Sequence, residues 1–200
     1  MKETEITVQV FNTTNEINDI LIKQGFKIVE KFTMDDYYFT AKADANLLSY
    51  AQLLKNSFLV REVNGESHDL KLLYKNKTLD NEGNVIAEEK TSCKFNDLNS
   101  ALKIFKNAGL NMWCELKQKM IVYEKGDIAF VLQIIEDLGS FIEYEEDKTM
   151  AHMDEHEKIN HMLNILKSLN LKLGEDYSCK KVFMKYNKSK QKAQLSETLK

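Results

Sequence analysis

The sequence contains no proline, from which we draw no functional conclusion, and its three cysteines, Cys93, Cys114 and Cys179, form no CxxC pair. Because these cysteines are odd in number and widely spaced, they support neither a disulfide framework nor a thiolate zinc site. We therefore expect reduced, structural thiols. No stretch approaches the roughly 20 apolar residues that a membrane span requires. The N-terminus also lacks a basic region followed by an apolar one, so we expect a cytoplasmic protein that does not bind a membrane.

An excess of charge of either sign is also missing. Charged residues make up 30% of the 200 residues, yet they leave a net charge of only −3. The chain therefore has no general attraction to nucleic acid, and any phosphate must be recognised by a local group of cations. The hydrophobic content of 43% is enough for one core. We expect one domain over residues 1–186 and a polar, Lys-rich, flexible tail over residues 187–200.

The first predicted strand, residues 3–10, has two faces of opposite chemistry. Side chains alternate across a strand, so one face is polar, with Glu3, Glu5, Thr7 and Gln9. The run at 141–145 brings a second carboxylate pair at the same spacing, Glu143 and Glu145. Such a pair belongs either to a solvated surface or to one wall of a polar cavity. On a solvated surface these residues would form cross-strand ion pairs worth about 0.2 to 1 kcal/mol each.

Hydrophobic periodicity, caps and turn residues predict the other elements. The predicted helices start at the Thr13 capping box and end at Gly25, start near Asp44, run from Asn96 or Asp97 to Gly109, and cover 128–138 and about 154–169. The predicted strands are 3–10, 26–31, 36–40, 58–63, 70–75, about 85–95, 111–122 as one or two strands, and 141–145. This order predicts an α+β fold of two similar halves, a closed antiparallel β-barrel with helices packed outside.

Six motifs in this order resemble the CYTH superfamily, the triphosphate tunnel enzymes that include class IV adenylate cyclases and thiamine triphosphatases. The resemblance covers about residues 3–177 and rests on the order and spacing of short motifs. Residues 3–7 (ETEIT) are similar to the ExExK strand, 36–39 (DYYF) to D-x-Y-F, 58–61 (FLVR) to L-R-x-R, 72–75 (LLYK) to L-T-Y-K, 117–123 (KQKMIVY) to K-x-R followed by Tyr, and 132–145 (LQIIEDLGSFIEYE) to L-D-x-V-x-x-L-G-x-F-x-E-x-E.

The resemblance implies a barrel whose interior is a charged tunnel for a nucleoside, thiamine or inorganic triphosphate. The expected ligands of Mg²⁺ or Mn²⁺ are Glu3, Glu5, Glu143, Glu145 and Glu88. The expected phosphate-binding residues are Arg61, Lys75, Lys117, Lys119 and Lys71, the last without a family motif behind it. No catalytic residue is assigned, and the best candidates are Glu3, Glu5 and Lys75. The segment 86–92 aligns poorly, and if its even-numbered residues face inward, Lys90 lies beside Glu88. A homodimer is implied by analogy only.

Three departures from the motifs remove a charge each. Thr7 replaces the lysine of ExExK, Leu59 the first arginine of L-R-x-R, and Gln133 the aspartate of the last motif. Two hypotheses therefore stay open: a metal-dependent phosphohydrolase or nucleotide cyclase, and a weakened or inactive relative that binds nucleotides or polyphosphate.

Two further patterns are weaker. His152 and His156 have the i, i+4 spacing that a metal could bridge, but without a third ligand we interpret them as a solvated helix start. Tyr37 and Tyr38 could stack on a base, but we interpret Tyr38, Phe39, Met112 and Trp113 as core residues.

Overall fold

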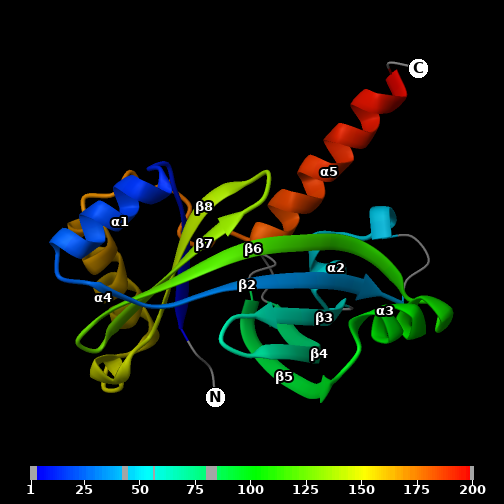
Figure 1. Ribbon diagram of the computed structural model, residues 1–200, viewed down its shortest axis with the longest axis horizontal. Helices are drawn as coiled ribbons and strands as arrows, with labels where there is room; N and C mark the ends of the chain where they lie inside the picture. The colour runs from blue at the N-terminus through cyan, green and yellow to red at the C-terminus, as the bar shows by residue number, and fades with distance from the viewer. Residues whose placement is uncertain (1–3, 42–44, 56, 80–84, 199–200) are drawn as a thin grey trace. The chain divides into compact units, whose positions relative to one another are not determined.

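The computed structural model describes residues 4–41, 45–55, 57–79 and 85–198, except for the side chains at 46, 54, 76–79, 85–88 and 193–198. Its strands are β1 (Glu5–Val10), β2 (Lys27–Thr40), β3 (Ser57–Asn64), β4 (His68–Leu79), β5 (Val85–Phe95), β6 (Asn111–Lys125), β7 (Ile128–Ile135) and β8 (Gly139–Glu145) (Figure 1). Its helices are α1 (Thr14–Lys23), α2 (Tyr50–Lys55), α3 (Leu98–Asn107), α4 (Glu155–Ser168) and α5 (Lys181–Thr198), with single 3-10 turns over Ala45–Leu47 and Lys148–Met150.

The strands form one antiparallel sheet in the order β1-β8-β7-β6-β2-β3-β4-β5. The predicted α+β class is therefore confirmed. The order ends at β1 and β5, so hydrogen bonds between the described strands do not close a barrel, and closure stays a prediction. Among the described residues no helix is long and apolar enough to cross a membrane.

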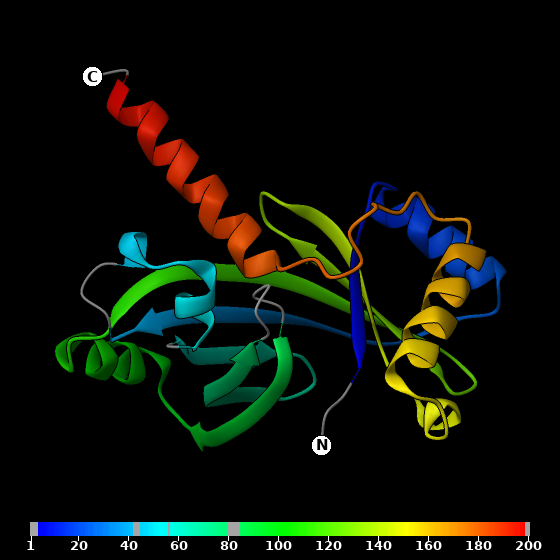
Figure 2. The same cartoon turned by 180° about the vertical axis from the view of Figure 1, so that it is seen from behind.

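The chain divides into two compact units, with β2 and β6 contributing to both. The first unit comprises Met1–Thr33 and Gln118–Lys180. Its core lies between the strands and the helices α1 and α4, which lie beside each other in both views (Figures 1 and 2). Ile6, Val8 and Tyr144 are at most 2% exposed in this core. The apolar face of β1 is therefore buried, as its alternation predicts.

The second unit comprises Met34–Lys117 and Lys181–Lys200. An aromatic cluster joins its strands to α2 and α5, which lie side by side (Figure 2). The ring of Phe183 stacks on that of Tyr50 with 4.4 Å between the ring centroids, and the rings of Tyr38 and Trp113 pack with their centroids 5.4 Å apart. Core packing of Tyr38, Phe39 and Trp113 is thus confirmed, whereas the core assignment of Met112 was wrong, because its side chain is 53% exposed.

Local signals predicted α1 and α3 well. Thr13 accepts from the backbone N–H of Glu16, whose carboxylate accepts from the N–H of Thr13, so the capping box is present. Asp97 caps α3 through the N–H of Ser100.

Two predictions about secondary structure were wrong. Residues 128–138 do not form a helix, because this apolar run of β-branched and aromatic residues is strand β7, buried on both faces. The predicted turn within residues 31–36 is absent, since no Gly or Asn interrupts β2 there. Residues 187–198 continue helix α5, whose first turns are anchored in the core by Phe183 and Tyr186, and the flexibility predicted for residues 187–200 stays a prediction.

Candidate metal and phosphate site

Three carboxylates meet on the polar face of the first unit. Strands β1 and β8 are antiparallel, with Glu5 opposite Glu145 and Thr7 opposite Glu143. Directly opposite residues put their side chains on the same face. One carboxylate oxygen from each of Glu5, Glu143 and Glu145 lies within 4.8 Å of the others. In the part of the chain that the structure describes, no other three acidic, His or Cys residues come this close.

Two buried neutral side chains hold Glu143. Its Oε2 accepts a hydrogen bond of 2.9 Å from Nε2 of Gln133 and one of 3.4 Å from Oγ1 of Thr7. Gln133 is 2% and Thr7 is 5% exposed. Both replace charged residues of the CYTH motifs, and both contact the same oxygen. Hydrogen-bond donors favour the ionised carboxylate without neutralising it.

One face of the second unit carries cationic residues that lie directly opposite one another on neighbouring strands. The register of β3, β4 and β5 places Arg61 opposite Lys71, Lys71 opposite Lys94, and Lys75 opposite Lys90. All five side chains therefore share one face of the three strands. The structure brings together three of the predicted phosphate-binding residues, Arg61, Lys71 and Lys75. Lys90 lies on the same face, which agrees with the alternative in which the even-numbered residues of 86–92 face inward.

Arg61 and Lys94 each hold a carboxylate. Arg61 donates from Nε and from Nη2 to the two oxygens of Asp36, at 2.6 and 2.7 Å. Asp36 is 2% exposed, so two of the five donors of Arg61 hold a buried carboxylate. Lys94 donates a hydrogen bond of 2.7 Å to Asp69. This hydrogen bond lowers the pKa of Asp69, although desolvation of the carboxylate acts in the other direction.

The structure does not bring Lys119 to the carboxylates. On β6 and β7, Lys119 lies opposite Ile134, and Met120 lies opposite Gln133. Because neighbours alternate, Lys119 lies on the opposite face of the sheet from Gln133 and Glu143. Met120 occupies the face where the sequence predicted a cation. Sequence alone could not reveal the face on which Lys119 lies, because the pairing register of a strand decides whether its odd- or even-numbered side chains point to a given face.

The other predicted residues are placed as follows. Glu3 lies outside the described residues, and so does the side chain of Glu88, whose backbone pairs with Lys77. Lys117 is in the second unit, with its Nζ 3.4 Å from Glu115 and its side chain 52% exposed. The exposed His152 and His156 belong to no metal-type cluster of described residues, in line with a solvated helix start.

Tyr37 lies in a partly buried acidic environment of the second unit. Burial raises the pKa of Asp35, and the nearby Lys117 opposes this. Burial, with the charge of Asp35, also raises the pKa of Tyr37 to about 12. The Tyr37 hydroxyl therefore stays a hydrogen-bond donor at neutral pH.

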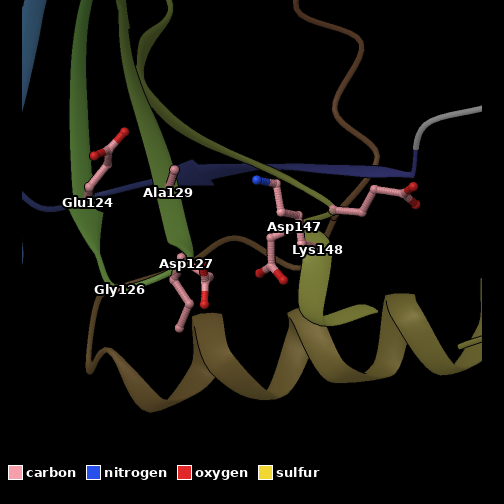
Figure 3. Close-up of a pocket in the computed structure, with 8 residues that line it drawn as sticks. Glu124, Gly126, Asp127, Ala129, Asp147 and Lys148 are labelled. Atoms are coloured by element: carbon pink, nitrogen blue, oxygen red, sulfur yellow. The ribbon is translucent and has the colours of Figure 1, made fainter. Parts of the chain in front are cut away.

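A depression of about 400 Å³ lies elsewhere in the first unit, where β6 turns into β7 and the chain leaves β8 (Figure 3). Two of its acidic residues, Glu146 and Asp147, form contacts that stabilise the fold. Glu146 accepts from Lys158 at 2.8 Å and from the N–H of Thr4, and Asp147 accepts from Tyr144 at 3.1 Å. We therefore do not assign the functional site to this depression.

Comparison with known proteins supports the motifs. No model of a protein family matches the chain. A Methanocaldococcus jannaschii protein named "putative adenylate cyclase" is 27% identical over 172 residues, 86% of this chain and 91% of the relative. The resemblance to the CYTH superfamily is therefore confirmed.

Solved structures share the fold of this chain at low identity. A Pyrococcus horikoshii protein has a TM-score of 0.65 at 16% identity, covering 94% of this chain and 99% of its own. A Vibrio parahaemolyticus protein with the same adenylate cyclase name has a TM-score of 0.61 at 16% identity, covering 92% and 98%. At such identities these structures show the fold alone. The agreement extends over nearly the whole chain.

Proposed function

We propose that this CYTH-like chain binds a triphosphate together with Mg²⁺ or Mn²⁺ and either hydrolyses it or cyclises a nucleotide. The observation that carries the proposal is the cationic face of β3, β4 and β5. The register puts three pairs of cations directly opposite each other on this face, Arg61–Lys71, Lys71–Lys94 and Lys75–Lys90. A compact, multiply charged anion is the ligand that such a group of cations would bind.

The carboxylates Glu5, Glu143 and Glu145 fit a hard divalent cation. They offer only oxygen ligands, their nearest oxygens lie within 4.8 Å of one another, and the hydrogen bond from Gln133 favours the ionised form of Glu143. When bound, such a cation neutralises phosphate charge and, in a hydrolase, lowers the pKa of its water. The lysines would hold phosphate oxygens as point charges. The enclosed tunnel that the CYTH resemblance implies is part of this proposal.

A second candidate function is binding with weak or absent catalysis. It is favoured by Thr7, which puts a neutral, buried hydroxyl where the CYTH motif has a lysine. A hydroxyl cannot neutralise developing phosphate charge, and such contacts are worth a few kcal/mol in a transition state. In this case the triphosphate binds to the same cationic face without turnover.

Turnover of ATP, thiamine triphosphate and inorganic triphosphate with Mg²⁺ or Mn²⁺ tests both candidates, with phosphate resolved from cyclic nucleotide. Lys75→Ala removes one cation of the face, and Lys106→Ala on the exposed side of α3 is the matched control. We expect metal-dependent turnover that Lys75→Ala abolishes and Lys106→Ala keeps. Binding that needs Lys75 but no turnover would select the second candidate. Neither binding nor turnover would make the charged strands a solvated surface.

A further inference from the structure

Gln133 is an unusual residue for its position. It is the single polar side chain of β7, an eight-residue strand that reads IAFVLQII, and it is 2% exposed. Its neighbours across the strands are Met120 and Phe141, which are 4% and 0% exposed. A carboxamide in such apolar surroundings is costly unless it is hydrogen-bonded. Its carboxamide donates to Oε2 of Glu143 at 2.9 Å.

Glu143 needs such a partner because of its own neighbours. Its carboxylate lies in one cluster with those of Glu5 and Glu145, and like charges at this distance repel. The donors from Gln133 and Thr7 orient this carboxylate and favour its ionised form.

We propose that Gln133 is the positioning residue of the cation site, with Thr7 in a secondary role: it holds Glu143 in the orientation in which the three carboxylates together bind a divalent cation before any triphosphate is present. The inference rests on the proposed metal site but not on turnover. Residues that orient metal ligands through hydrogen bonds typically contribute about 10- to 100-fold to metal affinity. The shorter contact, from Gln133, carries the larger share.

The test measures Mn²⁺ binding to the full chain without nucleotide. Titration calorimetry and the electron paramagnetic resonance signal of free Mn²⁺ each report the affinity. Gln133→Leu keeps the approximate volume and removes the donor, and we expect about a 10- to 100-fold loss of Mn²⁺ affinity. Thr7→Val should lose less, because its contact is 3.4 Å long. The matched control is Gln118→Leu, which changes a second buried glutamine of the first unit, 4% exposed and opposite Ile135.

Urea unfolding without metal separates positioning from folding. A merely structural Gln133 would lower stability while the folded fraction kept its Mn²⁺ affinity, and that result would overturn the inference. Equal losses in the Gln133 and Gln118 variants would overturn it too. If Gln133→Leu does not fold, Gln133→Met keeps the length of the side chain while removing the donor, and unchanged Mn²⁺ affinity in that variant would also overturn the inference. Wild-type protein that binds no Mn²⁺ would refute both this inference and the proposed metal site, whereas absent turnover with Mn²⁺ binding refutes catalysis alone.

Discussion

The guanidinium of Arg61 donates two hydrogen bonds, of 2.6 and 2.7 Å, to the carboxylate of Asp36. The side chain of Arg61 is 24% exposed and that of Asp36 only 2%. The residue that the motif predicts as a phosphate ligand is thus also the counter-ion of a buried acid. Removing it should affect folding as well as binding, and the two effects must be separated.

Arg61→Met should lower the free energy of unfolding by about 3 kcal/mol, because it leaves the charge of Asp36 buried without its partner. Urea unfolding at neutral pH measures this. The double variant Arg61→Met with Asp36→Leu should recover much of the loss, since it removes the uncompensated charge as well. A single variant as stable as the wild type would show that the pair does not stabilise the fold.

Lys90→Thr should weaken triphosphate binding by about tenfold and reduce its salt dependence, because it removes one cation of the face while keeping a strand-forming residue. Titration calorimetry at two salt concentrations measures both quantities. Lys106→Ala serves again as the control. Unchanged affinity in the Lys90 variant would mean that β5 does not contribute to the ligand site.

Thr7→Lys should raise turnover if the site is that of a weakened enzyme, because it restores an ammonium directly opposite Glu143. The same ammonium should weaken Mn²⁺ binding in the absence of triphosphate, since it neutralises part of the carboxylate cluster. Steady-state assays and Mn²⁺ titration report the two effects independently. If neither quantity changes, the side chain at position 7 does not act on the ligand.

Stability should fall in acid partly through Glu146. Lys158 donates to Glu146 at 2.8 Å and thereby lowers the pKa of that carboxyl below its ordinary value of 4.5. A carboxyl with a lowered pKa in the folded state contributes stability that is present above its unfolded pKa and is lost as the pH falls through the folded one. Lys158→Met should therefore cost about 1 kcal/mol at neutral pH and flatten the decline below pH 4.5. Urea unfolding across this pH range decides, and an unchanged decline would contradict the assignment.

Cys114 should resist thiol reagents until the second unit unfolds. Burial raises the pKa of its thiol to about 12, and its Sγ lies 3.6 Å from the carbonyl oxygen of Val182 in α5. Cys93 is exposed and should react first. Pulsed alkylation with mass spectrometry, with and without denaturant, tests this order. Labelling of Cys114 in native protein as fast as that of Cys93 would show that α5 does not stay packed on β6.

Features that depend on neighbours along the chain were predictable from the sequence. The capping box at Thr13 and Glu16, and the alternation that puts Glu5 on one face and Ile6 on the other, follow from local hydrogen bonds and backbone geometry. The i, i+2 spacing likewise predicted that Glu143 and Glu145 share a face, and the structure places them in one cluster.

Only the tertiary structure decided what depends on pairing between distant segments. The run at residues 128–135 is a strand because both of its faces are covered, and periodicity alone does not distinguish that from a buried helix. The register of β6 on β7 places Lys119 away from the carboxylates, since a shift of one residue exchanges the two faces. The contact of Gln133 with Glu143 likewise joins two strands, so the sequence determined which chemical groups are available and the cross-strand register determined which of them meet.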